Sequence, residues 1–301
     1  MLECVTEMSQ RFRCLLPFLS LLAVLVLPLR AEQGFPAVLQ PARNAIPDLT
    51  QTDPKGNFPG RGATYCGPVA VSNSLWALFG PHYEWWEEFT QYDLVRKLAS
   101  QSYMNIEVSK GCTVKQLTRG VDTYLRERGE KDYYLKFQGW RPHDHRYATG
   151  FFQPRLSWIK KILSAERSAV WLNVGWYRET PGKGSPKRIG GHWVTAVGYG
   201  VDGQGRPAPD HLIIHDPAQR AGPPAPEFIK LSRIRGGELT GLYENLPRSA
   251  AGFYLLEGGM HLKSEAHHAV LDGAVGLVLR GQEQKGDPRA PEANPAPDPF
   301  R

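Results

Sequence analysis

The feature that most constrains the fold is a cysteine at the start of an apolar segment. Cys66 stands between a glycine-rich loop and the run Val69–Phe79, in which nearly every residue is apolar or small. Pro68 suits the first turn of a helix, because that turn needs no backbone donor, and Gly80 with Pro81 ends the run. A helix with so little polar surface has to be buried. The sequence therefore predicts a buried helix over 69–79 with a thiol at its N-terminal end.

A cysteine at the N-terminal end of a helix is favoured as the thiolate, because the free N–H groups and the positive end of the helix dipole stabilise negative charge. A thiolate is a nucleophile. A catalytic role for Cys66 needs three further groups: a histidine within reach, a group that fixes the tautomer of that histidine, and a donor for the oxyanion. Segments distant from Cys66 have to supply them.

The histidine and its orienting group are found in two predicted strands. His192 stands at the start of the first strand, directly after two glycines, and Asp216 ends the second. Asp202 and Gly203 predict a hairpin turn between them. Counting outward from that turn, with three extra loop residues allowed, places His192 beside Asp216. The spacing therefore predicts a contact at one end of a sheet, in which the carboxylate holds an imidazole that can accept and return a proton.

Each of these residues also has a simpler interpretation. A histidine at the start of a strand is usually a polar edge residue, and an aspartate before a proline usually belongs to a turn. His215 is a second candidate base, but alternation along the strand turns it to the opposite face from Asp216. The combination of His192 and Asp216 with a cysteine at a helix N-terminus favours the catalytic interpretation.

The cysteine pattern leaves one alternative open. Of four cysteines, Cys4 and Cys14 fall in the N-terminal segment, which leaves Cys66 and Cys112. Two cysteines are too few for a disulfide scaffold. A Cys66–Cys112 bridge is the alternative to a free Cys66. The glycines and the proline around Cys66 favour the free thiol, and Cys112 is expected to pack as a small apolar residue.

The first 31 residues have the pattern of a signal peptide. Two arginines, Arg11 and Arg13, precede an apolar run over 14–29, and a small-residue cleavage site follows at Ala31. The run is short for a bilayer span and contains two prolines, which favours a cleaved signal over a retained membrane anchor. We therefore expect an exported protein, secreted or periplasmic, with no membrane contact beyond such an anchor.

Helix patterns come first along the chain and strand patterns second, which predicts an α+β fold. Residues 32–45 are expected to form a linker, 46–258 the folded domain, and 259–301 a C-terminal extension that is disordered from about 281, where it is rich in Pro, Glu and Ala. The expected helices cover 69–79, part of 82–102, 113–128 and 156–164. The expected strands cover 133–137, 169–177, 191–199, 211–216, 228–231 and 251–256.

Composition argues against several classes of function. The formal net charge is +6, but the charges are scattered without a basic stripe, so nucleic-acid binding is not expected. No phosphate-binding loop of the ATPase type occurs. The histidines at 143, 145, 261, 267 and 268 lack a closed set of ligands at zinc spacing. We therefore expect surface histidines, no metal and no cofactor.

Three motifs in this order resemble those of papain-like cysteine peptidases: Tyr65-Cys66-Gly67-Pro68, the segment 190–198 around His192, and His215-Asp216-Pro217-Ala218. The resemblance covers roughly residues 46–258, in particular to the branch similar to the peptidase domain that trims double-glycine leaders from bacteriocins. It implies a two-lobe fold: a helical lobe that carries Cys66, an antiparallel sheet that carries His192 and Asp216, and a cleft between them.

The same family places a glutamine upstream of the cysteine, where it shares the oxyanion with the backbone N–H of the cysteine. Gln51 is the glutamine in the corresponding place, although the segment between it and Cys66 is longer than in papain and rich in proline and glycine. Asn57 is the alternative donor. The ATP-binding motif of the leader-trimming transporters is absent from the sequence.

These observations predict an exported cysteine peptidase that hydrolyses peptide bonds in a peptide or protein substrate. Cys66 is expected to attack the carbonyl, His192 to act as base and then acid, Asp216 to orient His192, and Gln51 to hold the oxyanion. Two alternatives share the fold, namely an amidase or transglutaminase-type acyltransferase and a catalytically silent peptide-binding module. A structural protein stapled by a disulfide is the third.

Overall fold

The computed structural model describes residues 36–39, 46–80, 89–179, 181–182, 184–220, 222–241 and 246–280. All of them belong to the structural unit that begins at Phe35, and the other unit, Met1–Gly34, lies outside the described residues. The predicted signal peptide, most of the predicted linker and the tail 281–301 therefore lie outside them too. None of the helices in the described residues is long and apolar enough to cross a membrane.

The helices predicted from the sequence are present in the described residues. They are α1 (Cys66–Phe79), α2 (Gln91–Ala99), α3 (Val114–Glu127) and α4 (Leu156–Leu163), with short 3-10 segments η1 (Pro54–Gly56), η2 (Pro59–Gly62) and η5 (His145–Tyr147). Helix α1 begins at Cys66 itself, three residues earlier than expected. Helices α2 and α3 begin with capping boxes at Thr90 and Thr113, whose side chains satisfy N–H groups that have no partner within the helix.

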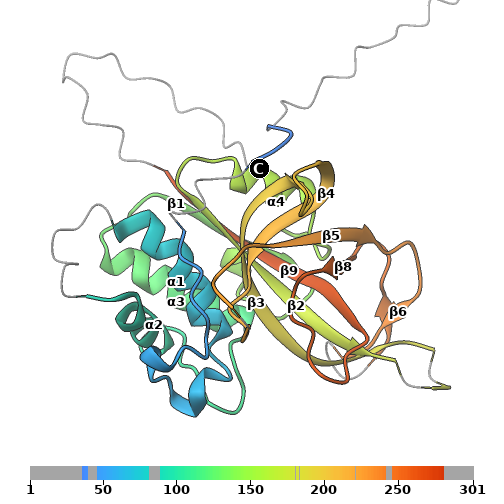
Figure 1. Ribbon diagram of the computed structural model, residues 1–301, viewed down its shortest axis with the longest axis horizontal. Helices are drawn as coiled ribbons and strands as arrows, with labels where there is room; N and C mark the ends of the chain where they lie inside the picture. Colours follow the sequence, from blue (N-terminus) through green and yellow to red (C-terminus); the bar gives the residue numbers. More distant parts are fainter. Residues whose placement is uncertain are drawn as a thin grey trace, which may run out of the picture. The chain divides into compact units, whose positions relative to one another are not determined.

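An antiparallel sheet forms the other part of the fold (Figure 1). Its strands run in the order β1-β9-β2-β3-β4-β5-β8, and β8 also pairs with β9, so the strands from β9 to β8 close into a ring. They are β1 (Tyr133–Gly139), β2 (Ser168–Arg178), β3 (Lys187–Val201), β4 (Pro207–His215), β5 (Glu227–Arg233), β8 (Tyr254–Gly258) and β9 (His268–Leu279), with β6 (Glu238–Leu239) and β7 (Arg248–Ser249) in a separate pair. The predicted α+β class is confirmed.

Strand β9 corrects the expected domain boundary. It pairs with β1 along one side and with β2 along the other, so the folded domain continues to Leu279 and does not end at 258. The strand was missed because Asp272, Gly273 and Gly276 interrupt its apolar pattern. Asp272 is nevertheless fully buried, since Trp140 and Tyr177 donate hydrogen bonds to its carboxylate and Arg188 forms an ion pair with it.

The predicted linker also contacts the domain. Leu39 pairs with Tyr199 of β3 through two backbone hydrogen bonds of 3.0 and 2.8 Å. The part of 32–45 that the structure describes, 36–39, therefore lies along the sheet, against the expectation of a free linker.

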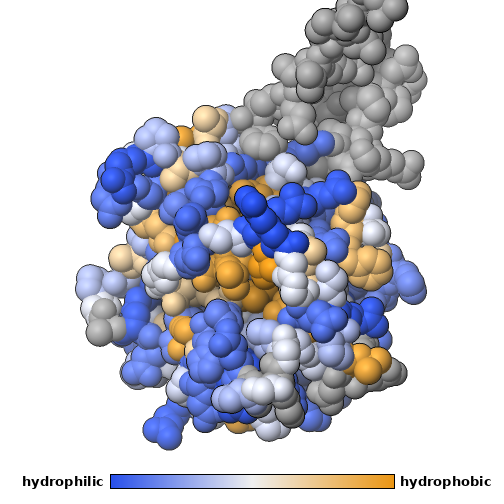
Figure 2. All heavy atoms as spheres, turned by 90° about the vertical axis from the view of Figure 1, so that its right-hand side faces the viewer, coloured by the Kyte–Doolittle hydropathy of each residue, from blue (hydrophilic) through white to orange (hydrophobic). Residues whose placement is uncertain are grey.

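Helices α1, α2 and α3 lie together beside the sheet (Figure 1). Two strand side chains fix α1 to it, because Trp171 of β2 and Thr195 of β3 both donate hydrogen bonds to the carbonyl oxygen of Ala70. An apolar cluster joins these helices to β1 and β9, and a second joins α4 to the strands of the ring. On the face that carries β5 and β8, apolar side chains gather in a hollow bordered by hydrophilic ones (Figure 2).

Candidate active site

Cys66 lies at the first position of α1 and lines a cleft of about 830 Å³ between the helices and the sheet. Its side chain is 8% exposed, and both Cys66 and Cys112 are free thiols. The backbone N–H groups of Cys66 and Gly67 belong to the first turn of the helix, where they have no partner within the helix. The structure therefore contains a free thiol in a cleft beside two backbone donors, as the sequence predicts.

Two glycines make this arrangement sterically feasible. A Cβ atom on Gly67 would lie 2.7 Å from Cβ of Cys112, so only glycine lets the two cysteine segments approach. Gly62 has a φ of +75°, and a Cβ atom there would lie 1.7 Å from the carbonyl oxygen of Gln51. Gly62 thus lets the loop before Cys66 pack directly against the backbone of Gln51.

His192 of β3 and Asp216, which follows β4, meet in the same cleft region. The imidazole Nε2 of His192 lies 2.6 Å from Oδ1 of Asp216, and both side chains are buried. Val201 pairs with Pro207, so the loop 202–206 contains the three extra residues that the sequence predicts. Within the hairpin, residues 209–211 of β4 and Val197 of β3 also lack a partner, and Thr195 pairs with His215. His192 and Asp216 are therefore diagonal neighbours and not directly opposite residues.

The electrostatics of His192 favour its protonated form. Burial alone would lower the pKa of the His192 imidazole, but the charge and hydrogen bond of Asp216 and those of Cys66 raise that pKa to about 10. Because Nε2 contacts Asp216, Nδ1 is the ring nitrogen left for the thiol. At neutral pH the geometry therefore suits an imidazolium beside a thiolate.

Asp216 is held by donors on both carboxylate oxygens. The backbone N–H of Ala218 donates to Oδ1 and the backbone N–H of His261 donates to Oδ2, each at 2.9 Å. Burial alone would raise the pKa of Asp216, but His192 and these two N–H groups keep that pKa below its usual value. His261 contacts Asp216 through its backbone N–H, so the identity of its side chain could not have predicted this contact. His261 itself lies at the exposed rim of the cleft, not apart from it.

Trp176 of β2 covers the imidazole. Its ring stacks on that of His192 with centroids 5.3 Å apart and an interplanar angle of 16°. Such a cover lowers the local dielectric and strengthens the contact between His192 and Asp216. Trp176 falls in a strand predicted from the sequence, where no role is expected for it, although its place at the end of a buried apolar strand was a usable signal.

Gln51 lines the cleft with Cys66 and His192, whereas the alternative donor Asn57 is exposed and does not line it. The amide Nε2 of Gln51 donates to the carbonyl oxygens of Gly62 and Ala63 at 3.0 and 3.1 Å. Its two hydrogens are therefore engaged with the loop before Cys66. Gln51 reaches an oxyanion only by sharing or exchanging one of these bonds.

The remaining candidates lie elsewhere. His215 faces away from Asp216, as alternation predicts, and its Nδ1 contacts the carbonyl oxygen of Pro47 at 3.0 Å. The ring of His143 packs on Phe137, and His145 is exposed. No group of three or more metal-ligating side chains occurs among the described residues. Cys112 packs beside Gly67, and burial, followed by the charge of Cys66, raises the pKa of its thiol.

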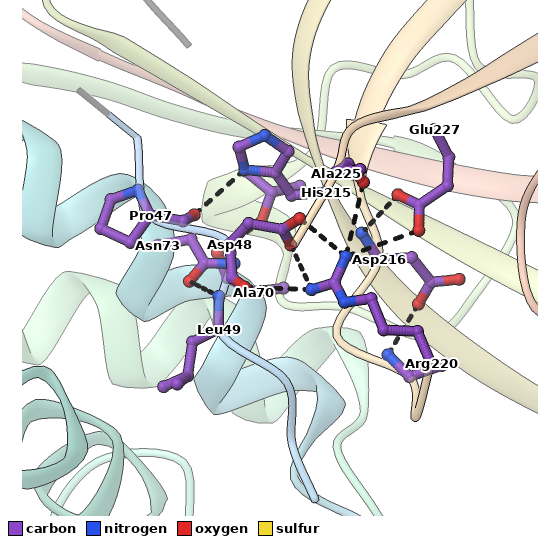
Figure 3. A network of polar contacts seen from close by, with 12 residues as sticks. Pro47, Asp48, Leu49, Ala70, Asn73, His215, Asp216, Arg220, Ala225 and Glu227 are labelled. Carbon is purple, nitrogen blue, oxygen red and sulfur yellow. Dashed lines mark hydrogen bonds and ion pairs between the residues drawn. The ribbon is translucent and has the colours of Figure 1, made fainter. Parts of the chain in front are cut away.

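A partly buried ionic network joins the segment 47–51 to the loop after β4 (Figure 3). The guanidinium of Arg220 lies between Asp48, at 2.6 Å, and Glu227, at 3.6 Å. Glu227 in turn accepts the backbone N–H of Asp216 at 3.2 Å. The backbone N–H of Gln51 donates to the carbonyl oxygen of Pro217 at 2.7 Å. These contacts tie the segment that carries Gln51 to the one that carries Asp216.

Glu227 makes this network sensitive to pH. Burial raises the pKa of Glu227 to about 7, and the charges of Asp216 and Asp48 add to the effect against that of Arg220. A carboxyl whose pKa is raised by folding contributes stability below its unfolded value, and that stability is lost as pH rises through the folded value. We therefore expect wild type to lose about 3 kcal/mol of unfolding free energy between about pH 4.5 and pH 7 relative to Glu227→Gln.

Urea unfolding at about pH 5 and about pH 8 measures this difference. Glu257→Gln is the matched control, because Glu257 is a half-exposed glutamate on the neighbouring strand β8. The unfolding free energy of Glu257→Gln should change between the two pH values by the same amount as that of wild type. Parallel pH dependence of wild type and Glu227→Gln would show that Glu227 ionises without cost in the folded protein.

The site thus combines a thiol at a helix N-terminus, an imidazole held by a carboxylate, and backbone donors beside the sulfur. This set can carry out nucleophilic attack on a carbonyl with proton transfer to a leaving group. In comparisons with known proteins, no family model, no curated protein and no solved structure matches the chain.

Proposed function

We propose that this chain is an exported cysteine peptidase of papain-like organisation, which hydrolyses peptide bonds through Cys66, His192 and Asp216. The observation that carries the proposal is the contact of 2.6 Å between His192 and Asp216 in the cleft region that also contains the free thiol of Cys66. Three residues far apart in the sequence supply the nucleophile, the proton carrier and the orienting carboxylate of one reaction.

The first half of the reaction is acylation. The Cys66 sulfur attacks the carbonyl carbon of the scissile bond, and the oxyanion that forms lies at the start of α1, near the N–H groups of Cys66 and Gly67. The His192 imidazolium transfers its Nδ1 proton to the leaving amine, and the C–N bond breaks. The product is a thioester on Cys66 and a neutral imidazole that Asp216 keeps in one orientation.

The second half is hydrolysis. Neutral His192 removes a proton from water, and the resulting hydroxide attacks the thioester carbonyl. The C–S bond breaks, the carboxylic acid product leaves, and the thiolate–imidazolium pair is restored. An amine in place of water would give an acyltransferase with the same residues, which is why amidase and transglutaminase-type chemistry belong to the same proposal.

One observation favours a second candidate, a silent peptide-binding module. Both amide hydrogens of Gln51 are engaged by the carbonyl oxygens of Gly62 and Ala63. Loss of a side-chain oxyanion donor costs about a hundredfold or more in rate. A protein that leaves Gln51 in this state when substrate is bound would hold a peptide in the cleft without efficient cleavage.

Incubation of the protein with a mixed peptide library and identification of the new termini by mass spectrometry tests the proposal. We expect cleavage at defined sequences by wild type and none by Cys66→Ala, which should still bind the same peptides. Intact peptides after long incubation with a protein whose Cys66 is free and reactive would favour the binding module. Equal cleavage by wild type and Cys66→Ala would show that a contaminating peptidase cleaves the peptides.

A further inference from the structure

The cleft around Cys66 is lined by basic side chains. Five lysines or arginines contribute to it, and none of its described lining residues is an aspartate or glutamate. They come from both walls: the loop before α3 and its first turn on one side, and the loop after β1, strand β3 and the loop before β9 on the other. They are Lys110, Lys115, Arg141, Arg188 and Lys263.

Two of these charges are balanced by nearby carboxylates. Arg188 lies 2.7 Å from the buried Asp272, and Lys110 lies 2.9 Å from Glu107 on the exposed surface. Lys115 and Lys263 differ, because no carboxylate of the described residues lies within ion-pair distance of either one. Among the described residues, the hydrogen-bond partner of the Lys263 ammonium is the carbonyl oxygen of Ile189, at 3.4 Å, which carries no formal charge.

The immediate surroundings of these lysines add to the positive potential. The first turn of α3 contains no acidic residue, and its capping box uses the neutral Gln116. The pair of His192 and Asp216 does not offset it, since an imidazolium and a carboxylate 2.6 Å apart cancel each other. A cleft whose walls carry one sign of charge concentrates field lines and attracts ligands of the opposite sign.

We propose that the cleft binds acidic peptides, with aspartate or glutamate side chains of the substrate next to Lys115 on one wall and Lys263 on the other. This inference rests on the proposed function, because it assigns a substrate class to the same site. The two lysines come from different elements that line the cleft, the first turn of α3 and the loop before β9, so the acidic side chains would be bound from both walls. Carboxylates held in this way would select the substrate and fix its register.

The test measures binding apart from chemistry. The full chain with Cys66→Ala is titrated into hexapeptides of glutamate, glutamine or lysine that carry one neutral fluorophore, and fluorescence anisotropy gives each Kd. We expect the glutamate peptide to bind at least about tenfold more tightly than the glutamine peptide, and the lysine peptide to bind most weakly. The preference should shrink in about 0.5 M salt, because exposed charges are screened.

Charge-reversal variants locate the effect. Lys115→Glu with Lys263→Glu should remove the preference for glutamate, whereas Lys131→Glu with Lys230→Glu changes the net charge equally on exposed positions outside the cleft and should retain it. Equal Kd values for the glutamate and glutamine peptides, or an unchanged preference in the cleft variant, would overturn the proposal. The result is independent of hydrolysis: tight binding without cleavage would refute only the peptidase.

Discussion

Replacement of His192 by alanine is expected to slow alkylation of Cys66 by iodoacetamide about a hundredfold at about pH 6. In wild type the imidazole, whose pKa is raised to about 10, is protonated at this pH and its positive charge favours attack by the sulfur as a thiolate. Without that partner an ordinary cysteine thiol is ionised in only about one part in 300 at about pH 6. The rate of peptide hydrolysis should fall by a further factor of about 10² to 10⁴, because the leaving amine also loses its proton donor.

The pH profile of alkylation separates this effect from simple misfolding. Wild type should react at a nearly constant rate from about pH 6 to about pH 9, whereas the rate for His192→Ala should rise steeply with pH and approach that of wild type at about pH 10. His145→Ala, which removes an exposed histidine, is the control and should keep the wild-type profile. Coinciding profiles for wild type and His192→Ala would mean that the imidazole does not ionise the thiol.

The residues of the proposed triad were predictable because each has a local signal. Cys66 lies between glycines and a proline at a helix start. His192 lies in the first strand of a hairpin whose turn the sequence marks, and Asp216 directly follows the second strand. The three extra residues are present in the loop 202–206, but the count missed the unpaired residues inside β4 and β3, which make His192 and Asp216 diagonal neighbours. Side-chain contacts across a hairpin can thus be predicted where the turn is well defined.

The groups that support the triad were not predictable in the same way. The N–H of His261 holds Asp216, but a backbone donor has no residue identity that a sequence pattern could reveal. Arg220 and Glu227 resemble ordinary surface charges until the segment 47–51 packs against them. Strand β9 contains a charge, Asp272, whose burial depends on three partners that are distant in the sequence. Tertiary packing decides all three cases.

Replacement of Asp216 by asparagine should affect both activity and stability. Asp216 contributes the largest of the effects that raise the pKa of His192, and burial alone would lower that pKa. The variant imidazole should therefore lose its proton far below pH 10, and the alkaline limb of kcat/KM should move down by several pH units. At about pH 8 we expect a loss of about 10² to 10⁴ in kcat/KM, because the neutral imidazole no longer protonates the leaving group or stabilises the thiolate.

The pKa shifts of His192 and Asp216 also determine how the stability lost in Asp216→Asn depends on pH. The raised pKa of His192 contributes stability below its unfolded value of 6.5, and this is lost as pH rises through about 10. The lowered pKa of Asp216 contributes stability above its unfolded value of 3.8, and this is lost as pH falls through the folded value. The unfolding free energy of wild type should therefore exceed that of Asp216→Asn by the largest amount between about pH 4 and pH 6.5, and this difference should shrink towards about pH 10.

Urea unfolding at about pH 5 and about pH 10, together with kcat/KM profiles, measures both effects. Asp210→Asn provides a matched control, since Asp210 contacts Nδ1 of its neighbour His211 at 2.9 Å in a pair that lies outside the cleft. The same Asp–His chemistry is present there without the burial and without the thiol. Asp210→Asn should keep the activity and the alkaline limb of wild type. An unchanged alkaline limb in Asp216→Asn would show that the carboxylate does not control the proton of His192, and the contact between them would then be structural.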